Sequence, residues 1–124
     1  MNWCGRPLLH TPVRYGLCLS QSDFDKALKK LGLPPEPYMG KGDEAIAHWL
    51  TAGDRVRVIV CMRRTSRPIE AVHATLVHES VHVWQRIKEY IGEENSGDEA
   101  EAYCIERIAF NLFKSYAKQR GAER

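Results

Sequence analysis

The stretch that decides the fold of this chain reads IEAVHATLVHESVHVWQRIKEYI and runs from Ile69 to Ile91. Its apolar residues recur at the spacing of one face of an amphipathic helix, at Leu76, Val83, Trp84, Ile87 and Ile91. Gly92 follows directly, and glycine suits the left-handed conformation that ends many helices. The pattern predicts one long helix over residues 69–91.

Two histidines inside this helix have the spacing H-E-x-x-H, in the segment His78-Glu79-Ser80-Val81-His82. Residues four apart lie about 40° from one another round an α-helix, so the two imidazoles point the same way, one turn apart. Two neutral imidazoles placed like this can take two corners of a tetrahedral zinc site. Glu79 is rotated about 100° from His78, which favours a role as the base that activates water over a role as ligand.

A solvated helix face is the alternative interpretation of the same residues. The two histidines lie opposite the apolar face, beside Gln85 and Glu89, as they would on a polar face that binds nothing. The residues around the motif favour zinc. A helix that is packed on both sides of a cleft needs uncharged residues there, and six neighbouring positions are uncharged: Leu76, Val77, Ser80, Val81, Val83 and Trp84. We therefore expect zinc, with a metal-free interaction helix as the alternative.

A third ligand is expected on the next helix, which the apolar spacing predicts from about Asp98 to Lys118. Glu99 follows His82 by 17 residues, enough to end one helix and bring the next back across it. Glu101 is a second candidate. Either glutamate can instead belong to a capping box, as Ser96-x-x-Glu99 or Asp98-x-x-Glu101. The residues alone do not choose between the two.

The rest of the chain is expected to form a small sheet and one more helix. Strands are predicted over 14–19, 45–50 and 55–62, the last two forming a hairpin across Gly53-Asp54, and a helix over 23–31. With 124 residues and no repeat, the chain is expected to be one α+β domain, residues 1–124.

From Ile69 to Phe110 the chain resembles the gluzincin metallopeptidases, in which a glutamate on a later helix follows H-E-x-x-H. The segment Glu99-Ala100-Glu101-Ala102-Tyr103 is similar to the third-ligand helix of the prenyl-protein endopeptidase branch, with Tyr103 where that branch has an aspartate. The chain lacks that branch's membrane helices, and its size is similar to that of the small gluzincin-like proteins of phages and prophages.

The resemblance implies a minimal zincin-like fold, with a small antiparallel sheet or hairpin, a motif helix and a third-ligand helix. It implies zinc on His78, His82 and Glu99, with Glu79 as general base for peptide-bond hydrolysis. Tyr103 becomes a candidate to hydrogen-bond a ligand or a tetrahedral intermediate, alongside Tyr38 and His48. The expected function is a zinc metallopeptidase acting on a peptide or protein; the alternative is a zinc-stabilised binding module without turnover.

Composition sets the expected partners and location. The formal net charge is +2 and the basic residues are scattered along the sequence, which predicts no nucleic-acid partner. No apolar stretch is long enough to cross a bilayer, so no membrane partner is expected. The start of the chain has no signal-peptide pattern and the four cysteines form no C-x-x-C pair, which together predict a cytoplasmic protein with reduced thiols.

Overall fold

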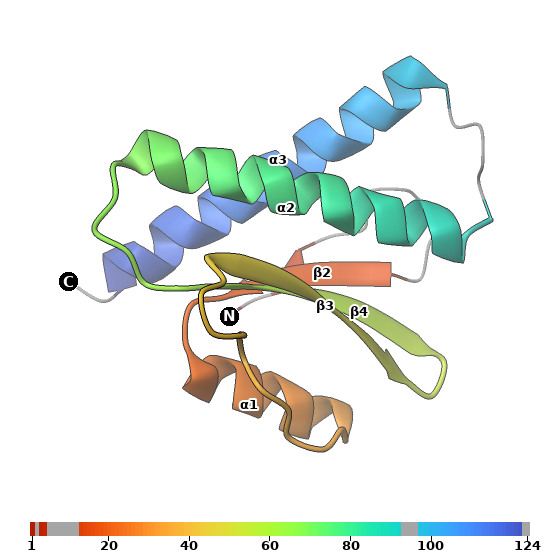
Figure 1. Ribbon diagram of the computed structural model, residues 1–124. Coiled ribbons are helices and arrows are strands. Elements are labelled where there is room, and N and C mark those ends of the chain that lie inside the picture. The colour runs from red at the N-terminus through yellow and green to blue at the C-terminus, as the bar shows by residue number, and fades with distance from the viewer. Residues whose placement is uncertain (2, 5–12, 93–96, 123–124) are drawn as a thin grey trace.

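The computed structural model describes residues 1, 3–4, 13–92 and 97–122, and it confirms the expected α+β class (Figure 1). The elements in chain order are β1 (Trp3–Cys4), β2 (Val13–Cys18), α1 (Gln21–Leu31), β3 (Ala45–Ala52), β4 (Arg55–Met62), α2 (Ile69–Tyr90) and α3 (Asp98–Ala122). Within these ranges no helix is long and apolar enough to cross a membrane.

The four strands form one sheet in the order β1-β2-β4-β3. The hairpin of β3 and β4 is antiparallel as predicted, in a register that runs from Ala45 opposite Met62 to Ala52 opposite Arg55. The sheet as a whole is mixed and not only antiparallel, because β2 and β4 are parallel over six residue pairs. The chain between them passes through α1 and β3, so it re-enters the sheet in the direction of β2.

The sheet is covered on both faces, by α2 and α3 on one side and by α1 on the other (Figure 1). Alternation along β4 divides its side chains between the two layers. Val56, Val58 and Val60 belong to the core under α2 and α3, whereas Ile59 and Cys61 belong to the core under α1. Burial on both faces explains why the second half of this strand is continuously apolar.

The helix ends follow the residues that predict them. The Ser20 side chain accepts a hydrogen bond from the Asp23 backbone N–H at 3.1 Å, and Gly32 closes α1 in the left-handed region with φ of 73°. Gly92 likewise has φ of 71°, directly after α2 and Ile91. The predicted boundaries of α2 are therefore confirmed to within a residue, while α3 runs four residues beyond the predicted end.

Packing between α2 and α3 is directed by the face of α2 that carries Trp84. This side chain is buried, and its indole N–H donates to the Glu101 carboxylate of α3 at 2.9 Å. Further along, the His73 ring of α2 stacks on Phe113 with ring centroids 4.1 Å apart. These two contacts hold the helices against one another at separate places along α2.

Candidate metal-binding site

The two motif histidines converge on the outer side of α2. His78 Nε2 and His82 Nε2 lie 3.2 Å apart, and the two rings are nearly perpendicular, with an interplanar angle of 76°. Two nitrogens bound about 2.0–2.1 Å from a tetrahedral zinc ion are separated by about 3.3 Å. The pair thus fits two positions of such an ion, and without an ion the same distance lets one imidazole donate a hydrogen bond to the other.

Gln85 fixes the orientation of His82. Its side-chain oxygen lies 3.0 Å from His82 Nδ1, and an amide oxygen can only accept, so this contact requires a proton on Nδ1. A neutral His82 then has its lone pair on Nε2, the atom that faces His78. The contact therefore holds the imidazole in the tautomer that binds a metal through Nε2.

Glu79 lies beside the histidine pair but points inward. Its side chain is 5% exposed, whereas both histidines are exposed. Burial raises the pKa of the Glu79 carboxyl; the nearby His82 and His78 oppose this shift, and the negative charge of Asp43 adds to it. A carboxylate held in such surroundings is a stronger base than one in water.

A groove between β3 and α2 gives access to these side chains. A cavity of about 400 Å³ is lined by the backbone and side chains of Ala45–Ala47 and by His78, Glu79 and His82. A second cavity, of about 460 Å³, shares His78 and Glu79 and extends toward Glu44 and Arg67. We call the two together the α2–β3 groove. β3 is an outer strand of the sheet, so the groove runs along a sheet edge. In the described part of the chain no further strand pairs with this edge.

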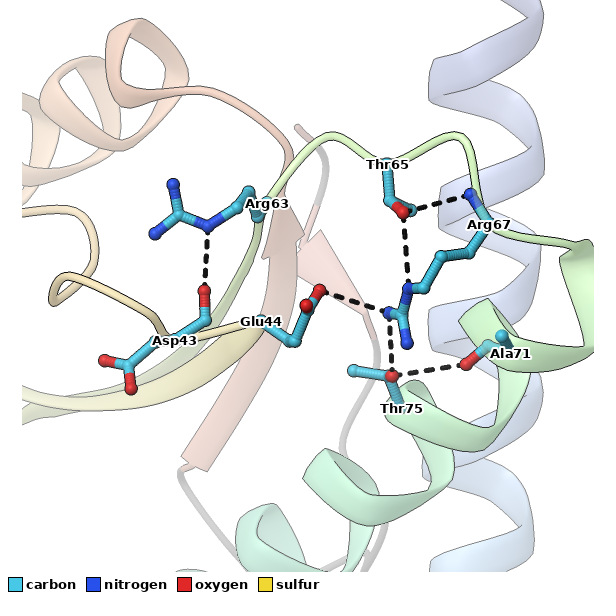
Figure 2. A network of polar contacts seen from close by, with 7 residues as sticks. All are labelled: Asp43, Glu44, Arg63, Thr65, Arg67, Ala71 and Thr75. Carbon is cyan, nitrogen blue, oxygen red and sulfur yellow. Dashed lines mark hydrogen bonds and ion pairs between the residues drawn. The ribbon is translucent and has the colours of Figure 1, made fainter.

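Arg67 organises the end of this groove, as Figure 2 shows. Its guanidinium donates to the side-chain oxygens of Thr65 at 3.2 Å and Thr75 at 3.1 Å, and it lies 3.4 Å from the Glu44 carboxylate. These contacts tie the segment before β3 and the segment before α2 to the helix itself. Arg63 makes a parallel connection, donating to the backbone oxygen of Asp43 at 2.8 Å.

Neither predicted third ligand joins the histidines. Among the residues that the structure describes, no three His, Cys, Asp or Glu side chains lie close enough together to hold a metal ion. Glu99 is exposed in the first turn of α3. Glu101 accepts from Trp84 and lies 3.5 Å from the Lys88 ammonium, contacts that lower the pKa of its carboxyl.

The reason is rotational. Trp84 marks the face of α2 that meets the first turns of α3, and it is roughly 120° round the helix from His78 and roughly 160° from His82. The start of α3 therefore packs against a different side of α2 from the one that carries the histidines. The predicted capping box that begins at Ser96 lies outside the described residues.

The three candidates for stabilising an oxyanion lie away from the α2–β3 groove. Tyr103 is 68% exposed on α3 and lines neither of the groove's cavities. Alternation along β3 places His48 on the α1 side of the sheet, where its ring packs at a tilt against Phe24 and contacts Glu36 at 3.2 Å. The Tyr38 hydroxyl is on that side too, within hydrogen-bond distance of the backbone oxygens of Cys18 and Met62.

Two residues that shape the site, Gln85 and Arg67, were not assigned a role in it from the sequence. Gln85 had a readable signal, because it follows His82 by three positions on the same helix face. Arg67 had none, since its partners Thr65, Thr75 and Glu44 meet it only when a strand and a helix are packed together.

With this geometry established, the chain was compared with known proteins. No family model, no curated protein and no solved structure matches it.

Proposed function

We propose that this protein is a zinc-dependent hydrolase of the metallopeptidase type, with His78 and His82 holding the metal and Glu79 acting as general base. The observation that carries the proposal is the convergence of the two Nε2 atoms, 3.2 Å apart, beside a carboxylate that is 5% exposed. Nitrogen donors at this separation suit zinc. Packing of α2 does not require two exposed histidines, His78 and His82, with the buried acid Glu79 between them.

Zinc in such a site supplies Lewis acidity, which polarises a carbonyl and brings the pKa of water to about 7. The protein's own contribution is made by Glu79 and Gln85. The Glu79 carboxylate accepts the proton of the attacking water and returns it to the leaving amine. Gln85 holds the proton on His82 Nδ1 and so keeps Nε2 available.

The substrate class follows from the position of β3. An outer strand offers backbone N–H and C=O groups to an extended peptide, which can add to the sheet edge and lie along the α2–β3 groove. The small side chains of Ala45 and Ala47 leave room for that peptide beside His78 and Glu79. We therefore propose a peptide or protein substrate.

A zinc-stabilised binding module is the second candidate function. It is favoured by one observation, that the described residues supply two histidines but no third ligand beside them. An incomplete ligand set is consistent with a site finished by a partner or used without turnover. Glu79 separates the two functions, because a purely structural metal site needs no base there.

The proposal is tested by counting zinc. The protein is purified without a metal-chelating tag, and zinc per chain is measured for the wild type and for His78→Ala, His82→Ala and Glu99→Ala. His73→Ala is the matched control, a histidine of the same helix that stacks on Phe113 instead of lining the groove. We expect about one zinc per chain in the wild type and the control, and none in the two motif variants.

A wild-type protein that takes up no zinc even after its addition would overturn the proposal. Zinc retained in Glu99→Ala would show that Glu99 is not a ligand, while its loss would show that the start of α3 reaches the site when metal is bound. Circular dichroism on each variant separates a lost site from a lost fold.

A further inference from the structure

In the described part of the chain, the sheet face that carries α1 is only partly covered by that helix. The single helix α1 packs on Ile59 and Cys61, using Phe24, Leu28 and Leu31 among others. Arg57 and Arg55 continue the same side of β4 toward the β3–β4 turn, because alternate residues of a strand share a face. Among the residues that the structure describes, α1 does not extend over this end of the face.

A cavity of about 670 Å³ lies at this uncovered end. Its charged lining comes from two elements, and we name it the basic groove after these residues: Lys26, Lys29 and Lys30 of α1, and Arg55 and Arg57 of β4. Asp23 is the single acidic residue of its lining, and Trp3 and Leu31 belong to the apolar part. A space of this size is typical of cavities that hold a ligand.

Positive charge is concentrated in the basic groove, although the net charge of the chain is only +2. The basic groove contains five of the chain's 18 Lys and Arg residues but one of its 16 Asp and Glu residues, so the remainder of the chain is net acidic. Within the described residues, Lys26, Lys29, Lys30 and Arg55 have no carboxylate at ion-pair distance.

Stabilisation of α1 explains only some of the basic residues in the groove. Lys29 and Lys30 lie in the last turn of α1, where positive charge complements the helix dipole. That reason does not apply to Arg55 and Arg57, which project from a strand toward the same space. Like charges gathered from two elements repel one another, and a bound polyanion relieves the repulsion.

An aromatic ring distinguishes this groove from a purely electrostatic patch. The Arg57 guanidinium lies over the Trp3 ring, 5.6 Å from its centroid, so an indole and a cation are held side by side in the lining. Grooves that bind single-stranded nucleic acid combine cations along the phosphate backbone with aromatic rings against which bases stack. An acidic peptide would use the cations but has no need of the ring.

We infer that the basic groove binds single-stranded nucleic acid, with phosphates toward the lysines and arginines and a base toward Trp3. This inference revises the expectation from net charge, because the fold gathers basic residues that are scattered in the sequence. It is independent of the proposed function, since the groove lies on the opposite face of the sheet from α2, which carries His78 and His82.

The test is fluorescence anisotropy with a fluorescein-labelled 12-nucleotide oligothymidylate, titrated with the wild type at several salt concentrations. Each phosphate contact contributes about −0.7 to the slope of log K against log salt for a single strand. The double variant Lys29→Ala/Lys30→Ala should therefore reduce the magnitude of the slope by about 1.4. The matched control is Lys114→Ala/Lys118→Ala, two exposed lysines of α3 outside the groove, which should leave it unchanged.

Trp3→Leu tests the stacking part. It keeps an apolar side chain and removes the ring, so binding should weaken by roughly 5- to 150-fold, the range of one lost stacking contact. No binding by the wild type at 100 µM protein and 50 mM salt would overturn the inference, as would an equal loss in the α3 control. Competition by polyglutamate as strong as that by unlabelled oligothymidylate would overturn it in favour of an acidic protein surface.

Discussion

His78 and His82 face one another across one turn of α2, with their Nε2 atoms 3.2 Å apart. This relationship places two nitrogen donors where one ion can contact both, and a third residue, Gln85, determines which nitrogen of His82 is available.

Replacing Gln85 by leucine should weaken zinc binding without abolishing it. The substitution removes the acceptor of His82 Nδ1–H and frees the ring to rotate, and losses of 10- to 100-fold in metal affinity are typical for such partners. Affinity is measured by competition with a chromogenic chelator at fixed pH. Glu70→Gln, at an exposed residue of the same helix that lines neither cavity of the groove, serves as control. An affinity unchanged in Gln85→Leu would show that this hydrogen bond does not orient the ligand.

Glu79→Gln should retain zinc but lose hydrolysis. Glutamine has nearly the shape of glutamate and cannot accept the proton, so the rate should fall by about 10²- to 10⁴-fold. The readout is a peptide library incubated with zinc-loaded protein and analysed by mass spectrometry, with zinc content measured in parallel. Equal hydrolysis by both proteins would remove Glu79 from the mechanism. If the zinc-loaded wild type cleaves no peptide at all, the binding-module function is supported instead.

Arg67→Ala should lower the free energy of unfolding. The lost hydrogen bonds to Thr65 and Thr75 should contribute more to this loss than the lost ion pair with Glu44. The guanidinium donates to Thr65 and Thr75, and their removal should cost about 1–2 kcal/mol of unfolding free energy. The Glu44 carboxylate is 56% exposed, so a double-mutant cycle of Arg67→Ala with Glu44→Ala should give a coupling below about 1 kcal/mol. Urea unfolding provides the values, and a coupling as large as the whole Arg67 effect would contradict this division.

Glu101→Gln should make stability less sensitive to acid. The hydrogen bond from Trp84, followed by the charge of Lys88, lowers the pKa of Glu101 below its ordinary 4.5. A carboxyl with a lowered folded pKa stabilises the fold above pH 4.5, and the stabilisation is lost as the pH falls through the folded pKa. The wild type should therefore melt above the variant at pH 6, and the difference should shrink by pH 3.

Glu99→Gln is the control for that experiment, because Glu99 lies in the same turn of α3 without a bond to Trp84. Both series are melted in the presence of a chelator, so that bound metal does not contribute. A difference between wild type and Glu101→Gln that stays constant from pH 6 to pH 3 would contradict the role given to the charge of Glu101.

Local pattern was sufficient for every element except the two-residue strand β1, which was not predicted. The period of the apolar residues predicted α1 to within two residues, and the same period with Gly92 predicted α2 to within one, because capping and amphipathicity act within a few residues. The alternation and the Gly53-Asp54 turn likewise predicted the hairpin of β3 and β4. The parallel pairing of β2 with β4 was not predicted, since it joins segments separated by a helix and a strand.

The arrangement of His78, Glu79 and His82 could be predicted without the fold, because helical spacing alone brings two imidazoles to one face. The residues that meet this face could not be predicted, because they depend on how the helices and the sheet pack together. Packing through Trp84 and Glu101 directs the start of α3 to another side of α2, and it leaves β3 opposite the histidines. Tertiary structure also brought Arg55 and Arg57 beside the lysines of α1. Contacts of this kind depend on how helices and strands are oriented when they pack, and the local spacing of residues does not predict that orientation.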